Sequence, residues 1–312
     1  MYRATFPCDL HTHTQYSDGN DTYEEIIAYA AEAGIEILAV TDHDVIVPET
    51  IEADGQTVQL VAYAQRKNVA LLRGIEFSCD TMVDDVHIVA LGCNCAHPFF
   101  ERERQDSSRS KIDGYRELCR LLAQGGIAID WEKDILLNGQ RNEDAVQRKH
   151  IFETIAQKGY VKEWSDAKRL VNQTKKYAVR RKKPHPAAII QNIHGAGGIA
   201  ILAHPYLIPE EALWAGRPVS RARYIDRLIQ AGLDGIEASY PYDKTSYSGA
   251  LTADEVEAEV RRLYAHRVSV LSGGSDYHNE GKKGSKNPRM LGERGVGKEY
   301  FMRNPLLRGL LR

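Results

Sequence analysis

The sequence predicts an α/β barrel that is interrupted by a helical insert. Short apolar runs of strand length alternate with helical segments in the first part of the chain and again in the last part. This alternation is typical of a parallel sheet covered by helices, and at least seven such units favour a closed or nearly closed barrel over a small open sheet. Between them the chain is more polar and mostly helical, so we expect residues 1–95 and 195–312 to form the barrel and residues 96–194 the insert.

Most barrel strands are expected from a short apolar run. The first helix is expected from its caps: Asn20, Asp21 or Thr22 can cap it before an acidic first turn, and Gly34 ends it. The expected strands cover residues 8–14, 35–40, 69–75, 87–92, 198–203, 234–238 and 268–272, with a last candidate at 295–297. The expected helices cover residues 22–33, 57–67, 221–231 and 253–266 in the barrel, and 111–124, 143–158, 163–173 and 186–194 in the insert.

Composition limits the class of protein. With 312 residues, of which 43% are hydrophobic, the chain can bury a large core. A net charge of −2 gives no global attraction to nucleic acid or to an acidic membrane. The sequence has no apolar signal segment and no run of about 18 apolar residues, so we expect no membrane span. The five scattered cysteines lack the spacing of a zinc site, and we expect reduced thiols in a cytoplasmic protein.

The stretch from Cys8 to Asp18 carries the first candidate metal ligands. In a strand, His11 and His13 share one face, where two buried imidazoles are costly unless a partner such as a metal ion binds both. Asp18 lies in a turn-prone Ser-Asp-Gly-Asn run and can bring a carboxylate oxygen back towards the pair. Alone, the His-x-His pattern is equally compatible with a polar edge strand that carries two solvated histidines.

Further ionisable side chains follow other apolar runs. The carboxyl ends of parallel strands meet at one face of an α/β barrel, where functional sites are built. Because five separate runs each end in a potential ligand, we expect one shared site; these residues are His43, Glu76, His204, Asp276 and His278. His87 instead begins its strand, so either that strand runs in the opposite sense or its histidine enters from the rim.

Three other carboxylates lie near these strand ends. Asp42 and Asp44 can act as helix caps or can support the ligands from behind. Glu237 also ends a strand, and we expect it to have a structural or supporting role rather than to bind the metal.

Taken together, these motifs resemble the PHP (polymerase and histidinol phosphatase) family of metal-dependent phosphoesterases. The segments that carry the resemblance are Asp-Leu-His11-Thr-His13 with Asp18, Thr-Asp-His43-Asp, Gly-Ile-Glu76, His87-Ile, Ala-His204-Pro and Gly-Ser-Asp276-Tyr-His278. The resemblance covers nearly the whole chain, and all the expected ligand positions are filled in order. It implies a distorted (β/α)7 barrel of PHP type that holds a cluster of two to three divalent metal ions.

The resemblance also implies which residues bind each ion. The first ion would take His11, His13, Glu76 and Asp276, the second Asp18, His43 and His278, and the third Glu76, His87 and His204. Glu76 would then bridge two ions. The mixture of imidazole and carboxylate ligands suits Mn, Fe or Zn better than Ca.

As a function, the resemblance implies hydrolysis of a phosphate ester, either a monoester or a cyclic phosphate, of a nucleotide-like or other small metabolite. The expected nucleophile is a metal-bound hydroxide, because clustered ions lower the pKa of a shared water. The sequence has no convincing Ser or Cys nucleophile motif, and no protein partner is evident. The alternatives are 5′–3′ exoribonuclease trimming of short RNA and a non-catalytic, metal-stabilised interaction module.

The insert is expected to select the substrate. Its segment Gln147-Arg148-Lys149-His150-Ile151 is similar to the Arg-Pro-His-Ile segment of family members that hydrolyse nucleotide phosphates. The similarity implies that Arg148 and His150 face a substrate phosphate, with Arg148 as a bidentate clamp. Lys149 stands where proline is usual in that segment.

Two other basic segments are candidates for phosphate binding. The run 175–183 is either a solvated face or a patch that attracts a nucleotide or a short single strand, with Tyr177 available for stacking. Lys282 and Lys283 are better placed to capture a phosphate, because they follow the strand that carries His278.

Overall fold

The computed structural model describes residues 2–53 and 55–311. The chain divides into two compact units, of which the first comprises Met1–Phe100 with Pro184–Arg312 and the second comprises Glu101–Lys183. The first unit contains the alternating strands and helices, and the second is helical. Helix α6 (Pro186–Gly195), which the predicted insert included, lies in the first unit, because Ile189, Ile190 and Ile193 are buried in its core.

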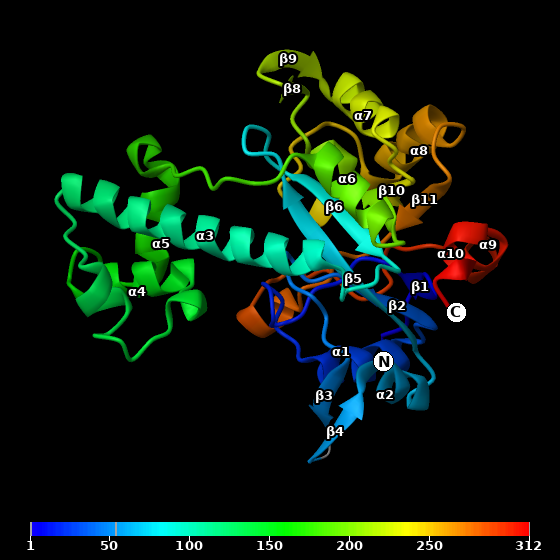
Figure 1. Ribbon diagram of the computed structural model, residues 1–312, viewed down its shortest axis with the longest axis horizontal. Helices are drawn as coiled ribbons and strands as arrows, with labels where there is room; N and C mark the ends of the chain where they lie inside the picture. The colour runs from blue at the N-terminus through cyan, green and yellow to red at the C-terminus, as the bar shows by residue number, and fades with distance from the viewer. Residues whose placement is uncertain (1, 54, 312) are drawn as a thin grey trace. The chain divides into compact units, whose positions relative to one another are not determined.

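The first unit is built on a seven-stranded sheet in the order β1-β2-β5-β6-β7-β10-β11 (Figure 1). Its strands are β1 (Cys8–Asp9), β2 (Ile37–Val40), β5 (Ala70–Cys79), β6 (Val86–Leu91), β7 (Ile199–Leu202), β10 (Gly235–Ser239) and β11 (Val270–Gly273). Neighbouring strands are parallel except at β6, which is antiparallel to both β5 and β7. Of the two alternatives for His87, the reversed strand is therefore correct.

The two edges of this sheet meet through the segments that follow β1 and β11. The amide of Leu10 donates to the carbonyl of Gly273 over 3.2 Å, and the amide of Asp276 donates to the carbonyl of His11 over 2.8 Å. These bonds nearly close the sheet into a barrel, which is the fold that the sequence predicted. They also bring the first ligand segment beside the last one.

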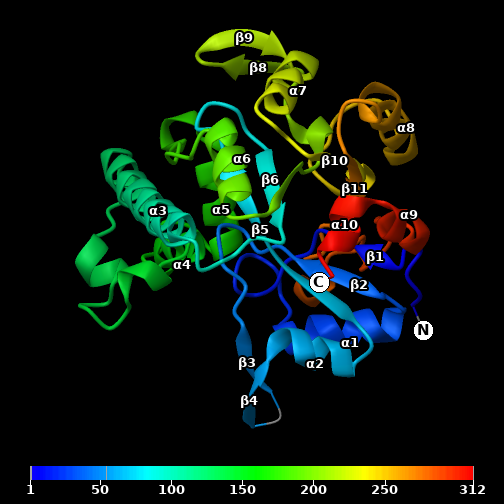
Figure 2. The same ribbon diagram turned by 45° about the vertical axis from the view of Figure 1, so that its right-hand side comes forward.

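Alternate residues of the strands point to opposite faces of this sheet. In β2, Ile37 and Ala39 join a cluster that draws on β1, β2, β5, β6, β7 and β11 and fills the barrel. Leu38 and Val40 instead join a cluster with α1 (Tyr23–Ala33) and α2 (Leu60–Arg66). Figure 2 shows these two helices side by side next to β2.

Helices α7 (Arg221–Gln230) and α8 (Ala253–Tyr264) lie where the sequence predicted helices. The C-terminal helices α9 (Lys298–Arg303) and α10 (Pro305–Gly309) were not predicted. Thr22 forms a capping box with Glu25 at the start of α1, and Gly34 ends that helix with a φ of 87°. Of the three cap candidates, Thr22 is therefore the one that the structure selects.

Two hairpins lie outside the barrel sheet. They are β3 (Thr50–Ala53) with β4 (Gln56–Gln59) and β8 (Glu211–Trp214) with β9 (Arg217–Ser220). The first hairpin corrects the helix expected at 57–67, which begins only at Leu60 because the preceding residues pair with β3. The last strand candidate, at 295–297, forms a single bridge between Val296 and Cys8.

The second unit has its own core. Helix α3 (Pro98–Gln124) begins in the first unit and supplies the first helix of the second, followed by α4 (Arg148–Gln157) and α5 (Trp164–Gln173). The expected helix at 143–158 is split into a short 3₁₀ turn, η2 (Glu143–Ala145), and α4. Buried residues of these helices pack together; they include Leu118, Leu122, Ile151, Ile155 and Val171. Within the part of the chain that the structure describes, every helix is too short or too polar to cross a bilayer.

Candidate metal centre

His11 and His13 lie on the same side of the N-terminal segment, as expected. Only Cys8 and Asp9 pair as a regular strand, but the segment continues in an extended form, and its two imidazole rings lie 5.1 Å apart. Their Nε2 atoms are 3.1 Å from each other, and both residues are buried. The prediction of a shared face is correct, and the solvated edge strand is wrong.

Glu76 lies at the centre of the cluster. It belongs to β5, which runs past it to Cys79 because the antiparallel β6 pairs with its last residues, so Glu76 lies inside a strand and not at the expected strand end. Its Oε2 atom lies 3.1 Å from His11 Nε2, from His13 Nε2 and from His43 Nδ1. Three imidazoles therefore converge on one carboxylate oxygen.

The other oxygen of Glu76 faces two more histidines. Its Oε1 atom lies 2.9 Å from His87 Nδ1 and 3.1 Å from His204 Nε2. His87 reaches this point because β6 is antiparallel, so that the start of β6 lies at the same end of the barrel as the carboxyl ends of the parallel strands. The two oxygens of Glu76 thus separate the histidines into two groups.

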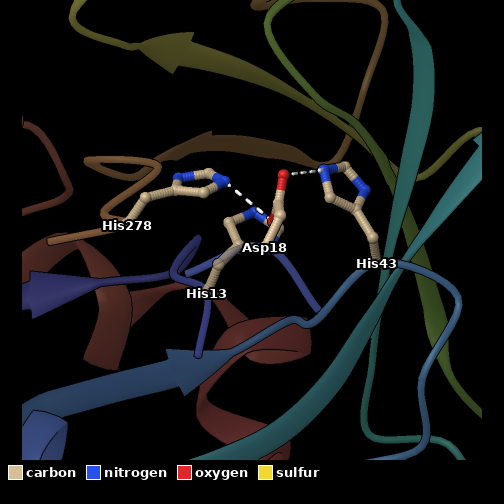
Figure 3. Close-up of side chains that lie close together, drawn as sticks. All are labelled: His13, Asp18, His43 and His278. Atoms are coloured by element: carbon tan, nitrogen blue, oxygen red, sulfur yellow. Dashed lines mark ion pairs between the residues drawn. The ribbon is translucent and has the colours of Figure 1, made fainter. Parts of the chain in front are cut away.

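A second group of side chains gathers around Asp18. Its carboxylate lies 3.0 Å from His278 Nε2, 3.8 Å from His13 Nδ1 and 3.9 Å from His43 Nε2. Figure 3 shows these four side chains turned towards one another, with His13 and Asp18 from the N-terminal segment, His43 from the segment after β2 and His278 from the segment after β11. Asp276 joins them, with its Oδ1 atom 3.1 Å from His13 Nε2.

The structure thus brings all nine predicted ligands together at one end of the barrel. Three sets among them have atoms close enough to hold a metal ion. The sets are His13 with Asp18, His43 and His278; His11 with His13 and Glu76; and His43 with Glu76 and His87. Asp276 and His204 are outside these sets but contact His13 and Glu76, respectively.

Several polar atoms of the cluster fit a metal ion better than they fit one another. Within the described residues, four buried side-chain atoms make no hydrogen bond: His13 Nδ1, His43 Nδ1, His204 Nδ1 and Glu76 Oε2. Two of these atoms, Glu76 Oε2 and His43 Nδ1, lie 3.1 Å apart but form no hydrogen bond, and buried polar atoms that make no hydrogen bond are rare in native proteins. Imidazole nitrogens and carboxylate oxygens that converge in this way are the ligands that transition metals take.

The electrostatics of the cluster keep its carboxylates ionised. Burial alone would raise the pKa of Glu76, but the surrounding imidazoles hold that pKa well below its usual range. Burial would likewise raise the pKa of Asp276, but Arg289 and His278 hold that pKa well below its usual range. Burial lowers the pKa of His13, but Asp276 and Glu76 outweigh it and raise that pKa to about 10. The carboxylates are therefore ready to bind cations at neutral pH.

Asp42 supports the segment that carries Asp18. Its buried carboxylate accepts hydrogen bonds from the amide and the hydroxyl of Thr14, each 2.7 Å long, and from the hydroxyl of Ser17 over 2.6 Å. Asp44 has a φ of 53° and accepts from the amide of Ser78 over 3.0 Å. No described helix begins at either residue, so the helix-cap alternative is wrong for both.

Glu237 has the supporting position expected of it. Its Oε1 atom lies 3.2 Å from His11 Nδ1, and its Oε2 atom accepts the amide of His204 over 2.8 Å. A carboxylate on the far nitrogen of a ligand histidine fixes the ring orientation and the tautomer. Sequence reasoning missed two further groups, Arg289 and Tyr240, which both contact Asp276 and carry no motif of their own.

The four predicted substrate contacts are divided between the two units of the chain. Lys282 pairs with Asp21 over 2.7 Å and with Glu25 over 2.9 Å, and Lys283 is exposed. Arg148 and His150 form the first turn of α4 in the second unit, where His150 Nδ1 accepts the amide of residue 147. The phosphate-binding roles of these four residues stay predictions.

The stacking role suggested for Tyr177 is wrong. Its ring is 3% exposed and packs in the core of the second unit, where it cannot stack on a base. Lys176 Nζ lies 4.9 Å from the centre of that ring. The basic run 175–183 therefore offers cations but no aromatic platform from Tyr177.

Comparisons with known proteins agree with this geometry. The family model of the PHP domain matches residues 9–183. A 3′,5′-nucleoside bisphosphate phosphatase of Chromobacterium violaceum is 30% identical over 288 residues, which cover 88% of each chain. A 5′–3′ exoribonuclease of Haemophilus influenzae is 32% identical over 200 residues, which cover 63% of this chain and 68% of the relative.

A crystal structure from Bifidobacterium adolescentis shares the fold, with a TM-score of 0.65 and 22% identity over 99% of this chain and 96% of that one. Together with the matched residues and the cluster of histidines and carboxylates, these similarities show that the chain belongs to the PHP domain family.

Proposed function

We propose that this protein is a metal-dependent phosphoester hydrolase that acts on a nucleotide-like or other small phosphorylated metabolite. The observation that carries the proposal is the convergence of nine histidine and carboxylate side chains on one end of the barrel, with buried ligand atoms that make no hydrogen bond in the described residues. Relatives of similar length and family hydrolyse nucleoside bisphosphates or RNA, according to their names. Phosphate monoesters are the leading substrate class, and cyclic phosphates are the next to test.

The cluster is proposed to hold two to three divalent ions, with Mn, Fe and Zn as candidates. Glu76 is proposed to bridge two of them, because its two oxygens face different groups of histidines. When bound, such ions supply an activated water at neutral pH and neutralise charge on the phosphoryl group. His11, His13 and Glu76 are at most 1% exposed as side chains, so they would hold the ions from the inner side of the barrel.

The substrate is proposed to enter on the Asp18 side. Side-chain exposure rises from the inner ligands to 16% at His87, 23% at His43 and 56% at Asp18. A phosphate that approaches from this side meets the exposed edge of the cluster first. Arg148 and His150 are proposed to face a substrate phosphate, on the basis of the family resemblance.

Trimming of 5′ nucleotides from short RNA is the second candidate. The exoribonuclease relative and the basic run 175–183 favour it, whereas the burial of Tyr177 removes one source of base stacking. A non-catalytic interaction module is disfavoured, because a chain released from catalysis has no need of all nine ligands. The five cysteines are free, which supports the proposal of a reducing, cytoplasmic compartment.

Elemental analysis followed by a screen for phosphoester hydrolysis tests this function. Metal-replete protein should contain two to three equivalents of a transition metal. It should then release phosphate from nucleoside mono- or bisphosphates, open a cyclic phosphate to a monoester, or release nucleoside monophosphates from short 5′-phosphorylated RNA, and a chelator should stop the reaction. Protein without bound metal, or metal-loaded protein inactive on every phosphoester, would contradict the proposal.

A further inference from the structure

The two oxygens of the Asp276 carboxylate face different kinds of partner. Oδ1 faces the cluster, 3.1 Å from His13 Nε2 and 3.5 Å from His278 Nδ1. Oδ2 faces away from it, accepts the hydroxyl of Tyr240 over 2.7 Å, and forms an ion pair with the guanidinium of Arg289. Only one oxygen of this carboxylate is therefore directed towards the histidines.

Arg289 and Tyr240 are themselves held in place. Glu280 Oε1 accepts Arg289 Nε over 2.8 Å and Nη2 over 2.5 Å, and its Oε2 accepts the backbone amide of the same arginine over 2.8 Å. The side chain of Arg289 is 12% exposed, and Tyr240 is 1% exposed, with its ring 5.3 Å from that of His204. Neither group is a mobile surface contact.

We propose that Arg289 and Tyr240 hold Asp276 as a one-oxygen metal ligand. The proposal rests on the metal-dependent function proposed above. A carboxylate can bind a metal ion through one oxygen or through both. Two donors on Oδ2, one of them charged, compete with a metal ion for that oxygen and leave only Oδ1 for coordination. Arg289 and Tyr240 are positioning residues, because they act through Asp276.

A one-oxygen mode has a direct consequence for the reaction. Catalytic metal sites keep a coordination position open for water or substrate, which a second carboxylate oxygen would otherwise fill. The charged donor also withdraws electron density from the ligand, and the partners behind a ligand tune both metal affinity and activity. Arg289 and Tyr240 would therefore keep a position free on the ion that Asp276 binds.

A purely structural role for Arg289 is the competing explanation. The guanidinium joins residues 276 and 280 to its own segment, so its loss could simply loosen this part of the chain. Arg294 provides a matched control: it lies five residues further on, is 19% exposed and pairs with Asp254 and Glu257, neither of which is a predicted ligand. Loss of Arg294 should thus reproduce the structural cost without touching Asp276.

The test compares wild-type protein with Arg289→Met, Tyr240→Phe and Arg294→Met after loading with Co²⁺. The visible d–d absorption of high-spin Co²⁺ weakens as its coordination number rises. We expect weaker absorption in Arg289→Met and Tyr240→Phe, because each variant loses one of the two donors that compete with the metal ion for Oδ2, and a wild-type spectrum in Arg294→Met. We also expect unchanged metal stoichiometry, and a fall in kcat of about ten- to a hundredfold with little change in KM, as is typical when a partner behind a metal ligand is lost.

An Arg289→Lys variant should keep a charged donor on Oδ2 beside the Tyr240 hydroxyl and recover part of the wild-type spectrum and kcat. A wild-type spectrum in both Arg289→Met and Tyr240→Phe would overturn the proposal. Equal effects of Arg289→Met and Arg294→Met would do the same. If Arg289→Met fails to fold, Tyr240→Phe decides alone. Failure of the wild-type protein to bind metal or to hydrolyse a phosphoester would instead refute the proposed function, so the two failures are distinguishable.

Discussion

At the scale of single residues, Glu76 is the side chain on which the cluster depends. Its two oxygens each contact histidines, and those histidines come from segments between residues 11 and 204. Such a residue was predictable from sequence because it follows an apolar run and fits a family motif. Arg289 and Tyr240 were not predictable in this way, because their importance comes only from contact with Asp276 across the fold.

Replacement of Glu76 by Gln should abolish turnover and lower the metal content. The amide has nearly the same shape but carries no charge, so it weakens the ligand sets on both sides at once. Elemental analysis and a phosphate-release assay on the same preparation measure the two effects. His266→Gln, which removes an exposed histidine, is the control and should match the wild-type protein. Normal activity in Glu76→Gln would show that Glu76 does not bridge two ions.

Metal binding should release protons at neutral pH. The pKa of His13 is raised to about 10 in the absence of metal, so this imidazole is protonated at pH 7, whereas a metal ligand must be neutral. The apparent metal affinity should therefore rise with pH, about tenfold per unit for each proton released. Calorimetric titration in buffers of different ionisation enthalpy measures the number of protons released on metal binding. Release of no proton at pH 7 would contradict His13 as a ligand.

At the scale of elements, strand direction and strand length were the features that the sequence left open. Apolar runs predicted the positions of β2, β6, β7 and β10 closely, because nearly all residues of these strands are buried. They could not predict that β6 is antiparallel, since direction depends on which strands become neighbours. The same pairing with β6 lengthens β5 beyond Glu76. Local pattern thus predicts where a strand lies, and tertiary contact decides how it runs and where it ends.

Helix α4 is the element on which the choice of substrate should depend. Replacement of Arg148 by Ala should raise KM for a phosphorylated substrate about ten- to a hundredfold, because a charge-assisted contact of a few kcal/mol is lost. Metal content should stay unchanged. Lys149→Ala, which removes the neighbouring exposed charge, should have a much smaller effect. Metal loss in Arg148→Ala, or equal effects of the two variants, would show that the role assigned to this segment is wrong.

At the scale of the whole molecule, the substrate class can be distinguished by its response to salt. A net charge of −2 gives no general attraction to RNA, so RNA binding would depend on local cations such as the run 175–183. Contacts to several phosphates make affinity fall steeply with ionic strength, whereas one or two phosphate contacts respond little. If small phosphoesters are the substrates, KM should change only a few-fold between 50 and 200 mM salt, conditions over which multiple phosphate contacts lose about 10³–10⁵ in affinity. If the protein turns over RNA rapidly and its KM for RNA rises steeply with salt concentration, the exoribonuclease function is favoured.

The division of the chain has a consequence for how this protein can change. All nine proposed ligands lie outside Glu101–Lys183, and the chain leaves and re-enters the first unit between β6 and β7, which pair directly. If the second unit selects the substrate as proposed, a new insert could alter which molecules are accepted without disturbing a single metal ligand. The chemistry and the choice of substrate could then evolve as separate modules.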